Sequence, residues 1–432
     1  ATVSLNWSQI LSNSRFSNTT LSYVNYKVKS ILSDTAGRSL SSDYYSVSEL
    51  HDFIVKKDVE FFISENNLGK LGINFSLHKY LLTYSDVYSD LIESGTGRQK
   101  DITNFEVTGF IQSEWQATPL FKFNTGGRIY YFHDQKLFKV EPRVSAVYNL
   151  SSDLSLKAAY SVANQFLHLV VKNDISLPTD LWYPSTKDIE PASAVQYVFG
   201  IDNFFFNHEY LLSVEGYYKG MKNLYEFRDN ARYSPSNPVS TLFTKGEGEA
   251  YGLELFLNKI SGDLSGWIGY TLSWTKRKFD DLNYGKIFYP RFDRRHDISL
   301  ILTYKLLDNF TLGLTWTYAS GQGFTVPVSQ FQIGSIGPDP FNRIVFNYTE
   351  RNTYKLPDYH KMDFNASYSF TWKRTTIETY LNIYNVYNRK NPFAYIASID
   401  EAKKDVNGIS QPKFNSISLF PFIPSIGINF KL

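Results

Sequence analysis

The last residues of the chain, from Pro424 to Leu432, alternate strictly between apolar and polar side chains. The apolar positions are Ile426, Ile428, Phe430 and Leu432, and the positions between them are Ser425, Gly427, Asn429 and Lys431. Successive side chains of a β-strand point to opposite faces, so this stretch predicts a strand with one apolar and one polar face. Such a strand at the chain terminus is typical of the closing strand of a transmembrane β-barrel, and we expect it to act as the assembly signal.

The same two-residue period recurs along most of the chain. Clear examples are the segments 71–78, 138–148, 298–304, 310–318 and 377–384, whereas 17–30 and 45–63 alternate less regularly. In all, about 17 alternating segments can be marked, and this period indicates strands rather than helices. The sequence therefore predicts an all-β fold, an antiparallel up-and-down transmembrane barrel.

Composition agrees with a barrel and disagrees with a helical membrane protein. Aromatic residues make up 17% of the chain, yet mean hydropathy is only -0.29, and no stretch approaches the ~18 apolar residues of a membrane helix. Barrel strands give only every second residue to lipid and carry aromatic girdles at both interfaces. The absence of Cys excludes disulfides and thiolate metal sites, and a net charge of +2 with scattered Lys and Arg gives no support for a nucleic-acid partner.

Short and long connections alternate between the predicted strands. Short turns fall near 12–15, 64–67, 118–119, 151–153, 207–208, 260–262, 307–309 and 371–375. Longer polar stretches occupy 30–44, 83–103, 166–192, 229–247, 277–293, 320–358 and 399–412, with one short link among them at 134–136. This alternation is typical of outer-membrane barrels, which have tight periplasmic turns and long extracellular loops. A large soluble β-protein such as a propeller is the alternative, but the chain has no repeat of blade length.

Charged residues within the strands fall on the polar face. They are Lys139, Glu141, Arg143, Lys157, Glu215, Lys219, Glu254 and Glu378. A charge facing lipid near mid-membrane costs about 2–4 kcal/mol, so this placement predicts a polar or plugged lumen. On the apolar face we assign Tyr270, Trp274, Trp316 and Tyr318 to the interfacial girdle.

The strand count bears on domain organisation. About 17 is odd, whereas single-chain bacterial barrels have even numbers of strands. The first segment, with Val3, Leu5 and Trp7 on one face, begins at once and by loop parity descends toward the periplasm. We therefore expect residues 1–432 to be one barrel domain, the C-terminal part of a longer protein. About five further strands would complete a barrel of 22, the size of plugged transporters.

Five stretches, in this order, resemble the C-terminal barrel of TonB-dependent outer-membrane receptors, in particular those of Bacteroidota. They are VEPRVSAVY (140–148), GEGEAYGLE (246–254), YPRFDRRHD (289–297), NIYNVYNRKNP (382–392) and FPFIPSIGINF (420–430). The resemblance implies a barrel of 22 strands in the Gram-negative outer membrane that imports a scarce ligand. An N-terminal plug would fill the lumen, and a short plug segment would be pulled by TonB. The plug, that segment and the first strands are not in this sequence, so active uptake by this chain rests on analogy.

The resemblance also implies partners. These are outer-membrane lipid and lipopolysaccharide, TonB through the upstream segment, the barrel-assembly machinery and a surface lipoprotein or other outer-membrane subunits. The ligand would be a siderophore, vitamin, glycan or peptide. Two other functions stay open: a structural subunit of a larger outer-membrane assembly, and a passive porin. An upstream plug with a TonB-contacting segment would support import.

Ligand contacts are expected from extracellular segments where aromatic and cationic residues occur together. The candidates are Trp182, Tyr183, Phe341, Arg343, Tyr348 and Arg351. The competing interpretation is that these side chains pack the loops against each other. No pattern of catalytic residues is present, and we expect no enzyme activity, no cofactor and no metal. The group from Asp293 to Asp297 resembles a metal or acid–base cluster, but on a strand His296 faces away from Arg295 and Asp297, which favours an interfacial role.

Overall fold

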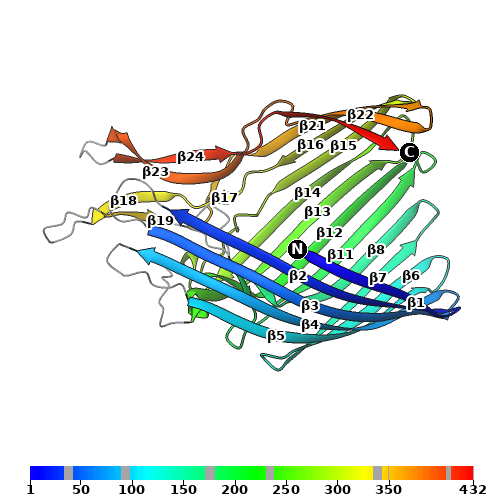
Figure 1. Ribbon diagram of the computed structural model, residues 1–432, viewed down its shortest axis with the longest axis horizontal. Coiled ribbons are helices and arrows are strands. Elements are labelled where there is room, and N and C mark those ends of the chain that lie inside the picture. Colours follow the sequence, from blue (N-terminus) through cyan, green and yellow to red (C-terminus); the bar gives the residue numbers. More distant parts are fainter. Residues whose placement is uncertain are drawn as a thin grey trace.

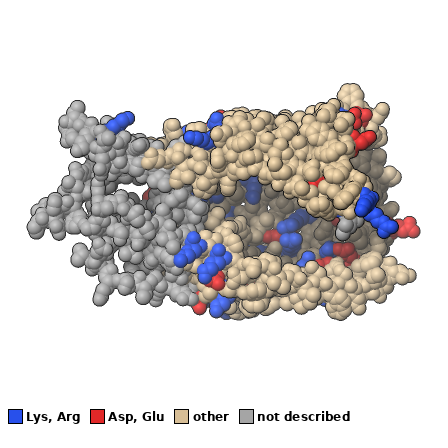
Figure 2. Space-filling view, turned by 45° about the horizontal axis from the view of Figure 1, so that its top comes forward, with Lys and Arg blue, Asp and Glu red and all other residues tan. Residues whose placement is uncertain are grey.

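The structure is a computed structural model that describes residues 1–33, 42–88, 98–170, 181–229, 238–333, 343–348, 350–404 and 410–431. Nearly all of its regular structure is β-strand, and 17 strands form one antiparallel sheet. The sheet curls round on itself and its strands are strongly tilted (Figure 1), and the space-filling view shows that it encloses a hollow (Figure 2). The predicted barrel architecture and strand number are therefore confirmed.

Within the large sheet, strands that are consecutive along the chain are also hydrogen-bonded neighbours. The strands are β1 (Thr2–Ser12), β2 (Arg15–Ser33), β3 (Ser42–Ser64), β4 (Asn67–Tyr88), β5 (Arg98–Gln116), β6 (Phe121–Phe132), β7 (Leu137–Asn149), β8 (Leu154–Gln165), β11 (Ala192–Phe205), β12 (Tyr210–Phe227), β13 (Phe243–Lys259), β14 (Leu264–Phe279), β15 (His296–Leu307), β16 (Phe310–Ala319), β21 (Tyr359–Trp372), β22 (Thr375–Tyr384) and β25 (Ile423–Lys431). In the described residues β1 pairs only with β2, and β25 pairs only with β22. Strands β1 and β25 are therefore the two edges of the sheet.

Smaller elements occupy the connections at the end of the barrel that we assign to the extracellular side. The described residues there form four two-stranded sheets: β9 (Leu167–Val170) with β10 (Leu181–Pro184), β17 (Gly323–Phe324) with β20 (Tyr354–Lys355), β18 (Pro327–Ile333) with β19 (Arg343–Tyr348), and β23 (Pro392–Lys404) with β24 (Ser410–Ser418). Two 3-10 helices lie in other connections: η1 (Val239–Leu242) between β12 and β13, and η2 (Asn283–Gly285) between β14 and β15. In Figure 1 the hairpins β18–β19 and β23–β24 project to the left, and the tight turns lie at the right.

The expectation of long polar loops was wrong in part. Strand β2 ends only at Ser33 and β3 already begins at Ser42, so both extend into the predicted loop 30–44. Hairpins occupy parts of three further predicted loops, 166–192, 320–358 and 399–412. The physical reason is that a strand leaving the membrane meets water on both faces. Its hydrogen-bonded ladder continues there, while the apolar–polar alternation that marks a strand in the sequence is no longer required.

The two faces of the sheet differ as predicted. Figure 2 shows acidic and basic side chains inside the hollow, while the outer wall is mostly uncharged in this view. The charged residues predicted to face inward share one face by register; the Lys157 ammonium, for example, lies 2.7 Å from Asp202 and 3.0 Å from Glu215 on neighbouring strands. The interior is therefore lined by charges that pair with each other.

The outward face carries large apolar side chains without a covering layer. Ile426, Ile428 and Phe430 are 82%, 55% and 68% exposed, and Leu432 lies outside the described residues. Leu300 and Leu314 contact only strand neighbours on this face, since no second sheet or helix packs on it in the part of the chain that the structure describes. No helix among the described residues is both long and apolar enough to span a bilayer. The apolar surface is thus oriented for lipid rather than for a protein interior.

Candidate functional site in the lumen and its extracellular cap

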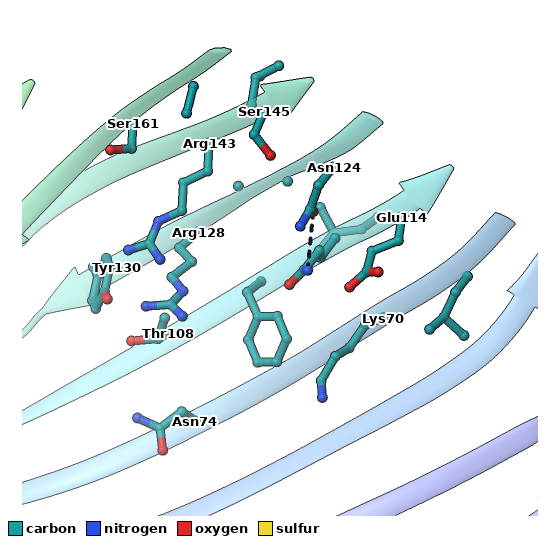
Figure 3. A pocket seen from close by; sticks show the side chains of 18 of the residues that line it. Lys70, Asn74, Thr108, Glu114, Asn124, Arg128, Tyr130, Arg143, Ser145 and Ser161 are labelled. Atoms are coloured by element: carbon teal, nitrogen blue, oxygen red, sulfur yellow. Dashed lines mark hydrogen bonds between the residues drawn. The ribbon is translucent and has the colours of Figure 1, made fainter. Parts of the chain in front are cut away.

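The inner face of β3 to β8 holds a cavity of about 780 Å³. Its polar lining consists of Lys56, Glu60, Lys70, Asn74, Glu106, Thr108, Gln112, Glu114, Asn124, Arg128, Tyr130, Arg143, Ser145 and Ser161. Within each strand these residues are an even number of positions apart, so they share the inward face. Figure 3 shows the labelled side chains projecting from neighbouring strands into one space.

Glycine on β6 helps to explain why the wall is hollowed here. Gly126 is paired with Arg143 of β7, and Gly127 follows it, so two positions of β6 carry no side chain. A Cβ on Gly126 would lie 2.7 Å from the backbone oxygen of Ile111, which only glycine avoids. In Figure 3 the side chains of Arg128 and Arg143 run in the same direction from adjacent strands into this space.

The charges of the cavity are unevenly paired. The Lys70 ammonium lies 2.5 Å from Glu60 and 3.4 Å from Asp58, and the Arg143 guanidinium lies 3.3 Å from Glu141. Among the described residues, no carboxylate oxygen lies within 4.0 Å of the Arg128 guanidinium. One cation of the wall is therefore available to an anionic group from outside the sheet.

Two polar atoms in the wall near Arg128 lack a hydrogen-bond partner. Asn74 and Thr108 face each other across β4 and β5, and neither Asn74 Oδ1 nor Thr108 Oγ1 has a hydrogen-bond partner within the described ranges. Thr108 is only 5% exposed. Buried polar groups nearly always find a partner, so the wall is incompletely hydrogen-bonded at these two atoms.

A histidine between two carboxylates lies above the cavity. His78 Nδ1 is 2.6 Å from Asp52 Oδ1, and His78 Nε2 is 3.9 Å from Glu106. Sequence reasoning missed this group because its members lie on three strands and meet only through strand register. In the described residues, no three or more His, Cys, Asp or Glu side chains are arranged to hold a metal ion.

The β9–β10 hairpin folds over the lumen as a cap with its own apolar core. Val170, Leu181 and Tyr183 of the hairpin are almost fully buried. They pack against the extracellular ends of β4 and β5 on one side and of β12 and β13 on the other, through Tyr80, Leu82, Ile102, Tyr225, Phe227, Leu242 and Phe243. We call this hairpin with its packed neighbours the cap cluster.

His168 is buried in the cap cluster. Its Nε2 lies 3.0 Å from Ser185 Oγ, its ring packs edge-on against Tyr225 at 5.1 Å, and the residue is 5% exposed. Burial lowers the pKa of His168 from 6.5 to about 4, because the imidazolium would lose its hydration. Burial likewise raises the pKa of Tyr183 to about 12.

From the lowered pKa of His168 we predict that docking of the β9–β10 hairpin becomes less stable in acid. A released hairpin would titrate near pH 6.5 and would bind the proton more readily than the docked one, so docking is lost as pH falls from about 6.5 toward about 4. Between pH 7 and pH 5 we expect a loss of about 2 kcal/mol. Hydrogen exchange of residues 167–170 and 181–184, corrected for intrinsic rates, measures it. His168→Gln should abolish the pH dependence, and equal protection of the native hairpin at both pH values would contradict it.

The predicted ligand residues separate into three groups. Tyr183 is 0% exposed inside the cap cluster, whereas Trp182 on the other face of β10 is half-buried. Arg343 and Tyr348 begin and end β19, and Phe341 lies outside the described residues. For Tyr183 the packing interpretation matches its burial, since the hairpin would have to move to expose it. Contact of these residues with a ligand stays a prediction.

Arg351 is held in a network of ion pairs beneath the loops. Its guanidinium lies 2.8 Å from Glu226 and 2.5 Å from Asp229, and Arg277 contacts the same Glu226 at 2.8 Å. The side chains of Glu226, Arg351 and Arg277 are 4%, 9% and 14% exposed. We call these four residues the loop latch, because they join β12, β14 and the segment before β20.

The residues from Asp293 to Asp297 lie in two different environments, one inside the fold and one on the outward face. Asp293 is buried, accepts the backbone N–H of Thr275 at 2.8 Å, and lies 3.3 Å from Arg295. His296 faces outward and is 2.9 Å from the Tyr270 hydroxyl. The residues do not converge on one point, as the alternation predicts, and their interfacial role stays a prediction.

The aromatic residues assigned to the girdle lie on the outward face. Tyr270 and Trp274 are in β14, and Trp316 and Tyr318 are in the extracellular half of β16, with their rings stacked at 6.2 Å. The Tyr318 hydroxyl donates to Asp358 at 2.8 Å. This position, apolar body outward and hydroxyl toward the loops, is the one that an interfacial aromatic requires. Their contact with headgroups stays a prediction.

Comparison with known proteins identifies the family. Residues 1–386 match the family model described as "TonB dependent receptor-like, beta-barrel". No curated protein matches the chain in sequence.

Among solved structures, similar folds include three bacterial receptors. The ferripyoverdine receptor of Pseudomonas aeruginosa has a TM-score of 0.60 at 16% identity, over 99% of this chain and 55% of that one. The siderophore receptor PiuA from Acinetobacter baumannii has a TM-score of 0.63 at 14% identity, over 99% and 64%. The ferric-catecholate import receptor Fiu from E. coli has a TM-score of 0.58 at 13% identity, over 99% and 63%.

The chain thus spans from 55% to 64% of the length of these receptors. At these identities the likeness shows the fold, and the family match rests on the sequence. The chain belongs to the TonB-dependent receptor family and forms its transmembrane β-barrel.

Proposed function

We propose that this barrel belongs to a receptor that imports a scarce ligand across the outer membrane with energy delivered through TonB. The observation that carries the proposal is the polar cavity beneath an extracellular cap. There Arg128, which has no carboxylate partner among the described residues, and the adjacent Arg143 offer donors to a polar solute. A passive pore would need neither a packed cap nor a binding wall.

Among the four expected ligand classes, the lining of the lumen cavity favours one that carries negative charge. Two guanidinium groups suit the carboxylate, catecholate or hydroxamate oxygens of a metal chelate better than a neutral glycan. Siderophore receptors are also among the structures with the same fold. We therefore place ferric siderophores first, with vitamins, glycans and peptides as further candidates.

Uptake of iron-55 from a panel of ferric siderophores tests the proposal. The full-length receptor would be expressed in a strain that lacks its own receptors. We expect saturable uptake that disappears when TonB is deleted, and at least a tenfold weaker apparent affinity in the Arg128→Ala, Arg143→Ala double variant, since a charge-assisted hydrogen bond contributes about 1.5–3 kcal/mol. Lys219→Ala, which removes an inward-facing cation that does not line the cavity, is the control. Non-saturable uptake of small hydrophilic solutes without TonB would instead identify a porin.

A structural role in a larger assembly is the second candidate, and one loop favours it. At the tip of the segment between β14 and β15, Asn283, Tyr284 and Gly285 all have positive φ, of 52°, 58° and 72°. Tyr284 and Ile287 are 78% and 60% exposed there, while Leu282 beneath them is fully buried. A rigid, exposed apolar tip on strained backbone is typical of a protein-binding surface. If a surface lipoprotein docks there, Tyr284→Asp should abolish its co-purification, and Tyr354→Asp should not.

A further inference from the structure

One aromatic ring on the wall of the lumen cavity is held in place by a glycine. Phe110 of β5 lines the cavity, and its cross-strand partner on β4 is Gly72. A Cβ on Gly72 would lie 2.6 Å from two ring carbons of Phe110 and 2.8 Å from the backbone oxygen of Lys57. Glycine within a strand often marks such a close approach. The ring of Phe110 therefore packs on the bare backbone of β4.

The rest of this ring is available from the lumen. Phe110 is half-buried. Tyr130, which also projects into the cavity, packs its ring against Phe166 at 5.5 Å, whereas no aromatic ring of the described residues stacks on Phe110. Aromatic rings bind one another in offset-stacked or edge-on geometry. Phe110 thus presents an aromatic surface to a molecule that enters the cavity.

Cations lie on both sides of β5 beside this ring. The Lys56 ammonium, from β3, is 5.7 Å from the centre of the Phe110 ring, and Arg128 of β6 is the cross-strand neighbour of Phe110. Both cations line the cavity. Figure 3 shows that Arg128 and Thr108, which is two residues from Phe110 along β5, project into the same space. A planar group stacked on Phe110 would therefore have cationic donors near its edge.

The carboxylates of the same row are turned into the wall. Asp58 and Glu141 are 4% and 1% exposed, and neither lines the cavity. Asp58 lies 3.3 Å from Lys56 and 3.4 Å from Lys70. The carboxylates that do line the cavity are at least two residues along their strands from this row: Glu60, Glu106 and Glu114. The surroundings of the ring consequently suit a group that is both aromatic and negatively charged.

We propose that Phe110 determines specificity in the lumen cavity by stacking on an aromatic ring of the ligand. Among metal chelates, the receptor would then prefer those whose charged oxygens are carried on aryl groups, such as catecholates and phenolates. Citrate and hydroxamate chelates have oxygen ligands but no ring, so they gain nothing from Phe110. The inference rests on the proposed function, because it concerns which chelate the same cavity accepts. The cavity volume of about 780 Å³ lies within the range of small-molecule sites.

Uptake of three ferric probes separates the effect of the ring from that of charge. A ferric tricatecholate is anionic and aromatic, ferric citrate is anionic without a ring, and a ferric trihydroxamate has neither property. The full-length receptor would be expressed in the strain without its own receptors. We expect the tricatecholate to have the highest apparent affinity. Phe110→Leu, which keeps apolar bulk without the ring, should weaken that affinity by about fivefold, as expected for a lost aromatic pair. It should leave the affinities of the other two probes unchanged.

Two matched variants control for changes in folding and in the lumen as a whole. Phe110→Tyr keeps a ring at the same position and should retain the affinity for the tricatecholate. Phe256→Leu makes the same substitution at a lumen-facing position of β13 that does not line the cavity, and it should have no effect. Heat-modifiable mobility on gels confirms that each variant is folded.

The outcomes distinguish this inference from the proposed function. Unchanged tricatecholate affinity in Phe110→Leu would overturn the inference, and so would an equal loss for all three probes, which would show a structural role. Saturable, TonB-dependent uptake of ferric citrate in preference to the tricatecholate would also overturn it and would leave import of a chelate standing. Absence of TonB-dependent uptake for every ferric chelate would remove both.

Discussion

Replacing Glu226 with alanine is expected to release the extracellular loops while leaving the barrel folded. In the loop latch one carboxylate holds two guanidinium groups, since Glu226 Oε1 contacts Arg277 and Oε2 contacts Arg351, both at 2.8 Å. Removing it leaves two buried cations without this partner. Breaking a buried ion pair from one side costs about 3–5 kcal/mol, because an uncompensated charge remains.

Hydrogen exchange of residues 350–355 is the measurement. A loss of 3–5 kcal/mol in local stability should speed exchange at least a hundredfold there. The matched control is the pair of Lys286 and Glu350, which joins the same loops at 2.6 Å but is 61% and 45% exposed. Lys286→Ala should change protection by less than about 1 kcal/mol. Similar effects of both substitutions would show that burial does not set the strength of the latch.

A single arginine on the outward face should destabilise the barrel far more than one on the adjacent inward position. Leu314, in the middle of β16, points outward, and Thr315 points into the lumen beside Asp363. An arginine facing lipid near mid-membrane costs about 2–4 kcal/mol, whereas in the lumen it meets water and a carboxylate. We therefore expect Leu314→Arg to lose this amount and Thr315→Arg to lose less than about 1 kcal/mol.

Reversible unfolding of the full-length receptor in lipid vesicles, titrated with guanidinium chloride, gives both values. The two variants differ by one position in the chain and introduce the same side chain, so helix or strand propensity does not separate them. If the two substitutions cost the same, hydrocarbon would not be the solvent of the Leu314 face. The membrane assignment would then lose its main physical support.

Strand alternation was enough to predict the fold, because lipid imposes its pattern locally. Each of Leu300, Leu314 and Ile428 had to be apolar whatever its neighbours were, and each lies on the outward face. The inward charges such as Lys157 and Glu215 were placed correctly for the same reason. The pattern failed outside the membrane, where β2 and β3 continue without alternation and where hairpins replaced the expected loops.

The sites depended on contacts between distant residues. Arg128 was not selected from the sequence, since only register places it with Thr108 of β5 and Arg143 of β7 around Gly126. Inward alternation was the one signal that pointed to it. Tyr183 was selected as a loop aromatic that either contacts a ligand or packs the loops together, and it is buried, because the β9–β10 hairpin packs between walls that are far apart in the chain.

The sequence by itself determined that this chain is a membrane barrel, its number of strands and which face of each strand meets lipid, because solvation by lipid acts residue by residue. Only the tertiary structure decided which lumen groups lack partners and how the cap and the loop latch close the extracellular end. Those features arise from side chains on separate strands, and strand register, which no local pattern encodes, brings them together.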